Sequence, residues 1–274
     1  MAGTLYIVGT PIGNLGDFSP RAVEVLSSCD FIAAEDTRVT IKLLNHFGIK
    51  KPMVSYYEHN RTQRGGVIIN RLLNGESCAL VSDAGMPIIS DPGEDLTALC
   101  HENNIPVYAV PGPCAFVTAL AVAGMPAGRF TFEGFLTKAK QNRREHLLEL
   151  VNEKRTMVFY EAPHKLPSTL EDMAEYFGDR KIALVKELTK IHENVERTTL
   201  FEAAKKYREV SPKGEYVLII EGKTETEEEE ITIEAATKMA LELISDGMSK
   251  NEASKEIAKK TGLKKSDIYK TLQE

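Results

Sequence analysis

Short apolar segments alternate with amphipathic segments along most of the chain, and this alternation limits the fold more than any other feature. Apolar strands that are spaced by helices form a mostly parallel sheet, which helices cover on both faces. The strands of a first sheet are expected at Leu5–Val8, Phe31–Ala34, Met53–Tyr57, Ala79–Ser82 and Pro106–Val110. We therefore expect the chain to begin with an α/β domain.

Two of the helices between these strands have recognisable starts. Ser19 is expected to cap a helix that has Pro20 at its first position, where the missing N–H costs nothing. Asn60 is expected to cap a second helix, which closes at Gly75.

The same alternation then restarts, which predicts a second α/β domain. Its strands are expected at Thr131–Phe135, Thr156–Glu161, Ile182–Val185 and Tyr216–Ile220. Helices near Arg143–Val151, Lys165–Phe177 and Leu200–Val210 separate them. The predicted domains are residues 1–124 and 125–222, and they join near Gly124–Arg129.

An acidic segment at 223–230 is expected to be a solvated linker. Beyond it, 231–274 has a helical pattern that predicts a small helix-turn-helix domain. Ser249 and Glu252 form a capping box, which marks a helix start. Ala258, Gly262 and Ile268 have the spacing of two helices that cross at a tight turn.

The last helix combines basic and acidic residues, so its charge favours no single role. It carries Lys264, Lys265 and Lys270 together with Asp267 and Glu274. Contact with nucleic acid and a packing or dimer role both remain open. The net charge of −6 argues weakly against a nucleic-acid partner, although five glutamates lie within 223–230 alone.

The composition is that of a globular protein, with 42% hydrophobic and 27% charged residues. Cys29, Cys78, Cys100 and Cys114 form no Cys-x-x-Cys pair, so we expect buried thiols in a reducing compartment and no metal site. The N-terminus has no basic segment of a signal peptide, and prolines interrupt the uncharged run after Asn103. We expect a cytoplasmic protein without a membrane-spanning helix.

Three loops at strand ends carry the residues suited to ligand binding. They are Gly9–Asp17, Ser82–Gly93 and Val110–Ala115, which follow the first, fourth and fifth strands. Ligands of open α/β sheets bind at the carboxyl ends of the strands, so these loops predict a shared site. The glycine spacing fits neither G-x-G-x-x-G nor a P-loop, although Glu35 lies where a ribose-binding acid would end a strand. A dinucleotide-dependent oxidoreductase is therefore a weaker alternative.

These loops and several later segments resemble the tetrapyrrole methylase superfamily, in the branch that methylates small-subunit ribosomal RNA. The resemblance covers residues 4–222, and the C-terminal helix-turn-helix is also typical of that branch. Met86 stands where threonine is expected, and Ala162–His164 lies at a variable position. The matching segments are Leu5–Asp17, Ala34–Arg38, Val81–Gly85, Ser90–Gly93, Pro111–Ala115, Phe159–Glu161, Glu187–Lys190 and Lys213–Glu215.

The resemblance implies two α/β domains with S-adenosylmethionine bound in the cleft between them, and it implies a homodimer. Transferred by position, the cofactor-binding residues are Pro11, Ile12, Asp83, Gly85, Met86, Ile88, Cys114, Ala115, Tyr160 and Leu188. The three loops that the strand ends alone predict as a binding site contain eight of these ten residues.

The resemblance also implies a product, a 2′-O-methylated cytidine in the decoding region of 16S rRNA. The acceptor is either the free rRNA or the small ribosomal subunit. Methyl transfer from a sulfonium to a hydroxyl depends mainly on positioning, but the hydroxyl must also lose its proton. Glu187 and Lys190 are the candidates for orienting or deprotonating it, and the alternative is a plain ion pair at a strand end.

RNA needs positive charge to neutralise its phosphates. Arg143 and Arg144, near Lys138 and Lys140, form the preferred basic patch. Further substrate-binding candidates, from loops expected to face the cleft, are Arg38, His59, Asn60 and His164, with Arg61 beside them.

Two further functions remain as alternatives. A methyltransferase acting on a corrin-type tetrapyrrole would share the fold and the cofactor. A non-enzymatic helix-turn-helix regulator would use the large domain only to sense a ligand. The arginine patch and the C-terminal helices argue against the first alternative, and the weakly basic last helix argues against the second.

Overall fold

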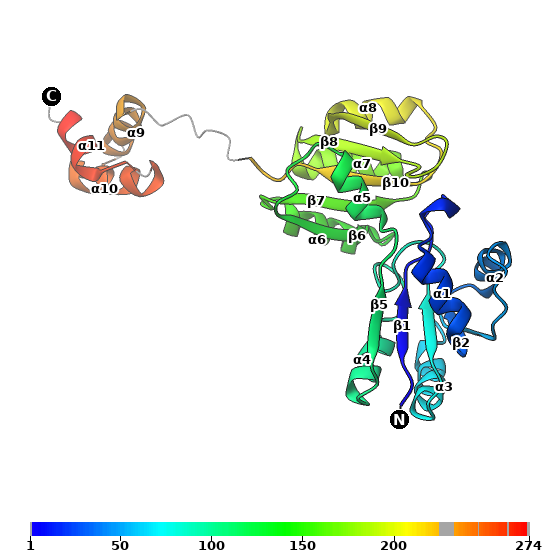
Figure 1. Cartoon of the computed structure of the whole chain (residues 1–274). Coiled ribbons are helices and arrows are strands. Elements are labelled where there is room, and N and C mark those ends of the chain that lie inside the picture. The colour runs from blue at the N-terminus through cyan, green and yellow to red at the C-terminus, as the bar shows by residue number, and fades with distance from the viewer. Residues whose placement is uncertain (1, 225–232, 246, 262, 273–274) are drawn as a thin grey trace. The chain divides into compact units, whose positions relative to one another are not determined.

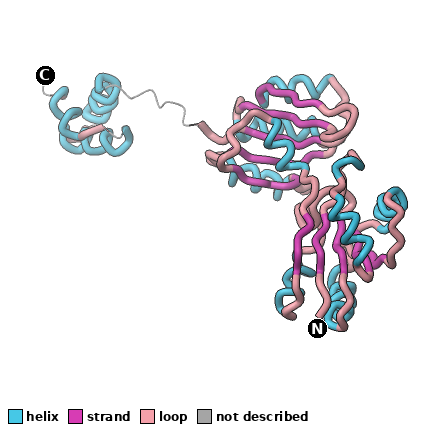
Figure 2. Tube along the Cα trace, in the orientation of Figure 1, coloured by secondary structure: helices cyan, strands magenta, loops and turns pink. Residues whose placement is uncertain are grey.

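The computed structural model describes residues 2–224, 233–245, 247–261 and 263–272. The chain separates into two compact units, Met1–Lys223 and Thr224–Glu274, which are described separately. The first unit contains two five-stranded sheets (Figures 1 and 2).

The first sheet is entirely parallel, with the strand order β3-β2-β4-β1-β5. β1 and β2 have the predicted bounds, and the other three strands differ from the prediction by one or two residues at an end. The strands are β1 (Leu5–Val8), β2 (Phe31–Ala34), β3 (Met53–Ser55), β4 (Cys78–Val81) and β5 (Val107–Val110).

Helices cover both faces of this sheet because alternate residues of each buried strand point to opposite sides. Along β1, Leu5 and Ile7 pack with α3 (Arg61–Leu73) and α4 (Glu94–Glu102). Val8 faces the other way and packs with α1 (Pro20–Ser28), while Leu44 of α2 (Thr37–His46) lies in the same cluster. Cys29, Cys78 and Cys100 are buried free thiols, as predicted.

One of the two predicted helix caps is confirmed. The Ser19 side chain accepts a hydrogen bond from Ala22 N at the start of α1. Asn60 occupies the N-cap of α3 but makes no capping bond. Its side chain instead accepts from Tyr57 N at 2.9 Å and donates to Ser55 O at 3.1 Å. Its amide therefore stabilises the loop before the helix, and the predicted capping bond is wrong.

The second sheet is mixed, with the order β6-β7-β10-β8-β9, in which only β6 and β7 pair in parallel. The sequence does not predict β9, because this edge strand is polar and has no apolar alternation. The strands are β6 (Phe130–Phe135), β7 (Thr156–Glu161), β8 (Lys181–Lys186), β9 (Asn194–Thr199) and β10 (Tyr216–Ile220).

Helices cover this sheet on both faces as well. One face packs against α6 (Lys140–Leu150), α7 (Leu166–Phe177) and α8 (Leu200–Glu209). The other face packs against α5 (Ala115–Val122), which follows directly after β5 of the first sheet (Figure 1). Residues 115–122 belong to the segment 1–124 of the predicted division, yet they pack in the core of the second sheet. α5 therefore fastens one sheet to the other.

The C-terminal unit contains the helices α9 (Ile233–Ser245), α10 (Lys250–Thr261) and α11 (Lys265–Thr271). They pack around a small cluster that includes Ile268, with Ala258 at its edge. Hydrogen bonds between Ser249 and Glu252 confirm the predicted start of α10. Gly262 and 225–230 of the predicted acidic linker lie outside the described residues.

The loops after β1 and β5 touch backbone to backbone at the carboxyl edge of the first sheet. A Cβ atom on Gly9 would lie 2.7 Å from the Cα of Gly112 and 2.7 Å from the sulfur of Met86. A Cβ atom on Gly112 would in turn lie 2.8 Å from the Cα of Gly9. Only glycine fits at both positions, so this pair sets how closely the first and third loops approach.

The predicted basic patch on α6 needs a correction at Arg143. This residue is only 9% exposed, and its guanidinium pairs with Asp172 at 2.6 Å and donates to Thr169 at 3.1 Å. Thr169 donates in turn to Glu161 at the end of β7. Consecutive residues of a helix point in different directions, so Arg144 is exposed while Arg143 faces the core. Arg143 joins α6, α7 and β7 and does not reach a surface-bound RNA.

We predict that Gly9→Ala lowers the free energy of unfolding by about 1–3 kcal/mol, because the added methyl group must push two loops apart. Gly66→Ala is the control, since a Cβ atom on Gly66 in α3 would have no neighbour within 4 Å. It should raise the stability by about 0.5–1 kcal/mol. Urea denaturation measures both values. An unchanged free energy of unfolding in Gly9→Ala would contradict the close approach of the two loops.

We also predict that Arg143→Leu lowers the free energy of unfolding by about 2–4 kcal/mol, because it leaves buried hydrogen-bonding groups without their partner. Arg144→Leu, at the exposed neighbouring position, should change it by at most about 0.5 kcal/mol. The same denaturation experiment compares the two variants. Equal effects would show that the two arginines do not differ in burial.

Candidate functional site

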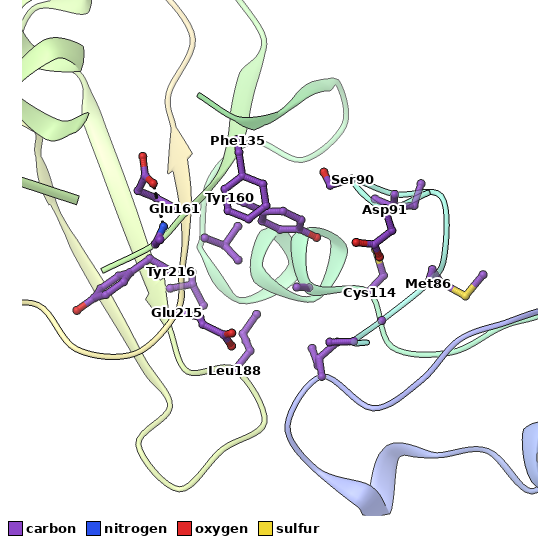
Figure 3. Close-up of a pocket in the computed structure, with 18 of the residues that line it drawn as sticks. Met86, Ser90, Asp91, Cys114, Phe135, Tyr160, Glu161, Leu188, Glu215 and Tyr216 are labelled. Atoms are coloured by element: carbon purple, nitrogen blue, oxygen red, sulfur yellow. Dashed lines mark hydrogen bonds between the residues drawn. The ribbon is translucent and has the colours of Figure 1, made fainter. Parts of the chain in front are cut away.

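A cavity of about 370 Å³ lies where the loops of the first sheet meet strand ends of the second sheet (Figure 3). Its lining from the first sheet comes from the loops after β1, β4 and β5. Its lining from the second sheet comes from β6, β7, β8 and β10 and the residues that adjoin them. The lining residues are Ile12, Ala84, Gly85, Met86, Ile89, Ser90, Asp91, Cys114, Ala115, Phe135, Tyr160, Glu161, Ala162, Pro163, Val185, Leu188, Glu215, Tyr216 and Val217.

The loop after β4 is tied to the loop after β1 by paired backbone hydrogen bonds. Thr10 N donates to Gly85 O at 2.9 Å, and Gly85 N donates to Thr10 O at 3.1 Å. Further along the same loop, Ile88 and Ser90 have positive φ angles of 79° and 65°. Such conformations cost about 1–3 kcal/mol each outside glycine and are found mainly at functional sites. The loop is thus held in a defined and strained shape.

The wall from the second sheet is aromatic. The hydroxyl of Tyr160 accepts a hydrogen bond from Phe116 N at 3.1 Å, which links β7 to the first turn of α5. Phe135 packs against the Tyr160 ring, with their centroids 5.3 Å apart. Burial raises the pKa of Tyr160 to about 12. The phenol therefore keeps its proton at neutral pH and can donate it to a ligand in a hydrogen bond.

In the described chain, the wall from the first sheet contains one carboxylate, that of Asp91. Burial, together with the carboxylates of Glu35 and Asp83, raises the pKa of Asp91 to about 6. Burial also raises the pKa values of Glu35 and Asp83, which lie outside the cavity lining. Asp83 is exposed and its carboxylate accepts a hydrogen bond from Asp36 N at 3.1 Å.

Glu187 and Lys190 form a compact ion pair beside the cavity. Glu187 Oε1 accepts from Lys190 Nζ at 3.0 Å and from Glu215 N at 2.9 Å, and Lys190 Nζ donates to Glu215 Oε2 at 2.7 Å. The bond from Glu215 N lowers the pKa of Glu187. Burial lowers the pKa of Lys190, but the hydrogen bonds to Glu215 and Glu187 outweigh it and raise the pKa overall. Both groups are therefore charged at neutral pH, which corresponds to the ion-pair alternative; a catalytic role stays a prediction.

The predicted cofactor residues divide into two groups. Ile12, Gly85, Met86, Cys114, Ala115, Tyr160 and Leu188 line the cavity. Pro11, Asp83 and Ile88 belong to the same loops but lie outside its lining. Ile88 instead packs against the core of the first sheet.

The predicted substrate residues, Arg143 included, all lie outside the cavity lining. Arg38 is exposed and paired with Asp36 at 2.6 Å. His59, Arg144 and His164 are exposed, and His164 follows directly after Pro163 of the lining. Asn60 is partly buried in the loop before α3. An RNA-binding role of these residues stays a prediction.

Several polar residues of the lining are absent from the predicted site. Ser90, Asp91, Glu161 and Glu215 all stand in motifs that support the resemblance, so their position is a usable signal. Phe135 carries no such signal, because an aromatic residue in a strand is usually part of the core. The residue is 53% exposed and borders the cavity.

The described part of the chain has neither a membrane-spanning helix nor a metal-binding cluster. No helix there is long and apolar enough to cross a membrane. No group of three or more His, Cys, Asp or Glu side chains among those residues is arranged to hold a metal ion.

Comparisons with known proteins identify the family to which this chain belongs. The profile of the family described as Tetrapyrrole (Corrin/Porphyrin) Methylases matches residues 4–204. Ribosomal RNA small subunit methyltransferase I of Synechocystis sp. is 45% identical over 268 residues, which cover 97% of this chain and 96% of that protein. The protein of the same name from Halalkalibacterium halodurans is 47% identical over 270 residues, which cover 97% and 93%.

Among solved structures, uroporphyrin-III-C-methyltransferase from Thermus thermophilus has the same fold. It matches with a TM-score of 0.56 and 19% sequence identity, over 80% of this chain and 94% of that one. The family profile spans most of the chain, and the sequence relatives align over nearly its full length. The chain therefore belongs to the tetrapyrrole methylase family, within the group of ribosomal RNA small subunit methyltransferase I proteins.

Proposed function

We propose that this protein transfers a methyl group from S-adenosylmethionine to the ribose 2′-hydroxyl of a cytidine in the decoding region of 16S rRNA. The observation that carries the proposal is the cavity between the two sheets, in a chain whose full-length relatives are named as small-subunit rRNA methyltransferases. The cytidine and its place in the rRNA come from the motif resemblance.

The cavity fits S-adenosylmethionine in size and in chemistry. About 370 Å³ lies within the range of small-molecule sites, which are largely apolar with a few placed polar groups. Leu188, Phe135 and Tyr160 supply apolar and aromatic surface, while Asp91 and the Tyr160 hydroxyl supply polar contacts. When bound, the cofactor supplies an activated methyl group on a positively charged sulfur.

The residues of the chain would act mainly by positioning the acceptor hydroxyl. Lys190 is charged and held by two carboxylates, so it is suited to orient the hydroxyl or a neighbouring phosphate rather than to remove a proton. Glu187 already accepts two hydrogen bonds at Oε1, so its free acceptor capacity lies mainly at its other oxygen. We assign the pair an orienting role.

The RNA would contact basic and polar residues that lie outside the cavity lining. Arg144, His164, Arg38, His59 and Asn60 are the proposed contacts, since arginine grips phosphate and histidine stacks on splayed bases. The acceptor is the 16S rRNA or the small ribosomal subunit, and the protein acts as a cytoplasmic homodimer.

We predict that the protein transfers tritium from labelled S-adenosylmethionine to undermethylated small ribosomal subunits or to free 16S rRNA. Mass spectrometry of RNase digests should place the label on a single cytidine ribose. A corrin precursor, offered in parallel, should remain unlabelled. Label in the corrin, or in neither acceptor, would overturn the proposed substrate and leave the family assignment intact.

We further predict that Lys190→Ala lowers kcat for RNA methylation about 10- to 100-fold, while the Kd for S-adenosylmethionine changes less than about threefold. Lys206→Ala is the matched control, because Lys206 forms a similar 2.7 Å pair with Glu196 away from the cavity. Lys190→Arg should restore part of kcat, since it keeps the charge. A loss confined to thermal stability, with kcat unchanged, would leave Lys190 a purely structural residue.

A further inference from the structure

Three carboxylates line the cavity, and the chain itself satisfies two of them. Glu161 accepts from Ala162 N at 2.8 Å and from the hydroxyl of Thr169, which bonds to the buried Arg143. Glu215 pairs with Lys190 at 2.7 Å and is largely exposed to solvent. Each of these two carboxylates therefore has its negative charge compensated by groups of the protein or by water.

Asp91 is the third carboxylate, and it is only partly exposed to solvent. Among the described residues, no basic side chain forms an ion pair with it. The charged groups that act on it in the described chain are Glu35 and Asp83, both acidic, and the only group there that stabilises its anion is the hydroxyl of Ser82. Tyr160, which faces it from the second sheet, and Cys114, which lies beside it, are neutral at physiological pH (Figure 3).

An anion in such surroundings is costly unless a cation joins it, because burial penalises the charged form. Its position in the lining means that a ligand in the cavity would meet it directly. The pKa of about 6 leaves it mostly ionised at pH 7, so the cavity wall presents a negative charge to an entering ligand. The group that complements this wall is therefore a positively charged group on the ligand.

We propose that Asp91 recognises the positive charge of the sulfonium, so that the cavity binds S-adenosylmethionine more tightly than the uncharged thioether S-adenosylhomocysteine. This inference rests on the cofactor of the proposed function. It assigns Asp91 to cofactor binding, and it explains how the product would leave the site. Once the methyl group has been transferred, the sulfur is neutral and the attraction that held the cofactor is lost.

The proposal makes binding depend on pH with a definite sign. The pKa of Asp91 is raised from 3.8 to about 6 in the free protein, and a bound cation would lower it again. Binding of S-adenosylmethionine therefore weakens as the pH falls through 6, because the protonated carboxyl must first ionise. At pH 5 only about a tenth of Asp91 is ionised, so the affinity should be about tenfold lower than its limit at high pH.

The test is calorimetric titration of wild-type protein and Asp91→Asn with both ligands at pH 7. The variant should bind S-adenosylmethionine about 10- to 100-fold more weakly, which corresponds to a pKa change of one to two units. Its affinity for S-adenosylhomocysteine should change less than about threefold. When the pH is lowered from 7 to 5, the wild type should lose affinity for S-adenosylmethionine but not for S-adenosylhomocysteine. The variant should show no such loss.

Two controls separate charge recognition from general damage. Glu215→Gln removes a lining carboxylate that Lys190 already neutralises, so it should leave the ratio of the two affinities unchanged. The thermal unfolding temperature of Asp91→Asn should equal or exceed that of the wild type at pH 7, because the substitution removes an uncompensated charge.

Equal loss of both ligands in Asp91→Asn would overturn the proposal, because the ammonium and the hydroxyls are common to the two molecules. An unchanged ratio with a flat pH profile would overturn it as well. Wild-type protein that binds neither ligand would instead contradict the proposed function itself. The two failures can therefore be told apart in one experiment.

Discussion

The close contact of three loop backbones at the carboxyl edge of the first sheet is the constraint on which the site depends. Gly9 and Gly112 leave no room for a side chain between the first and third loops, and Thr10 and Gly85 join the first loop to the second. The parallel strands bring all three loops to one edge, and these contacts then lock them together. The cavity wall is thus built mainly from backbone geometry, and side chains supply its polarity.

The other half of the site comes from α5. This helix leaves the first sheet after β5 but packs on the second, where Ala119 and Leu120 join the core with Val158 and Val217. The hydrogen bond from Phe116 N to the Tyr160 hydroxyl fixes the start of the helix against β7. Residues far apart in the sequence therefore line one cavity.

The strands and the three loops are predictable from the sequence, because buried strands have long apolar runs and bind ligands at one end. The polar edge strand β9 is not, because Asn194–Thr199 has no apolar pattern. The prediction of a surface position for Arg143 is wrong because charge alone does not reveal which side of a helix faces the core. The motif marks the position of Asp91, but the lack of a cationic partner in the described chain becomes visible only when the neighbouring segments are in place.

Cys114 is the one cysteine that is not buried, and it stands in the cavity wall at the N-cap of α5. Its partial burial raises its pKa, so the thiol reacts slowly, and it lies where a ligand in the cavity would cover it. Cys114 can therefore serve as a labelling site that reports on the cavity. The rate at which a small alkylating reagent labels this thiol gives a direct reading of how often the cavity is occupied, in an otherwise unmodified chain.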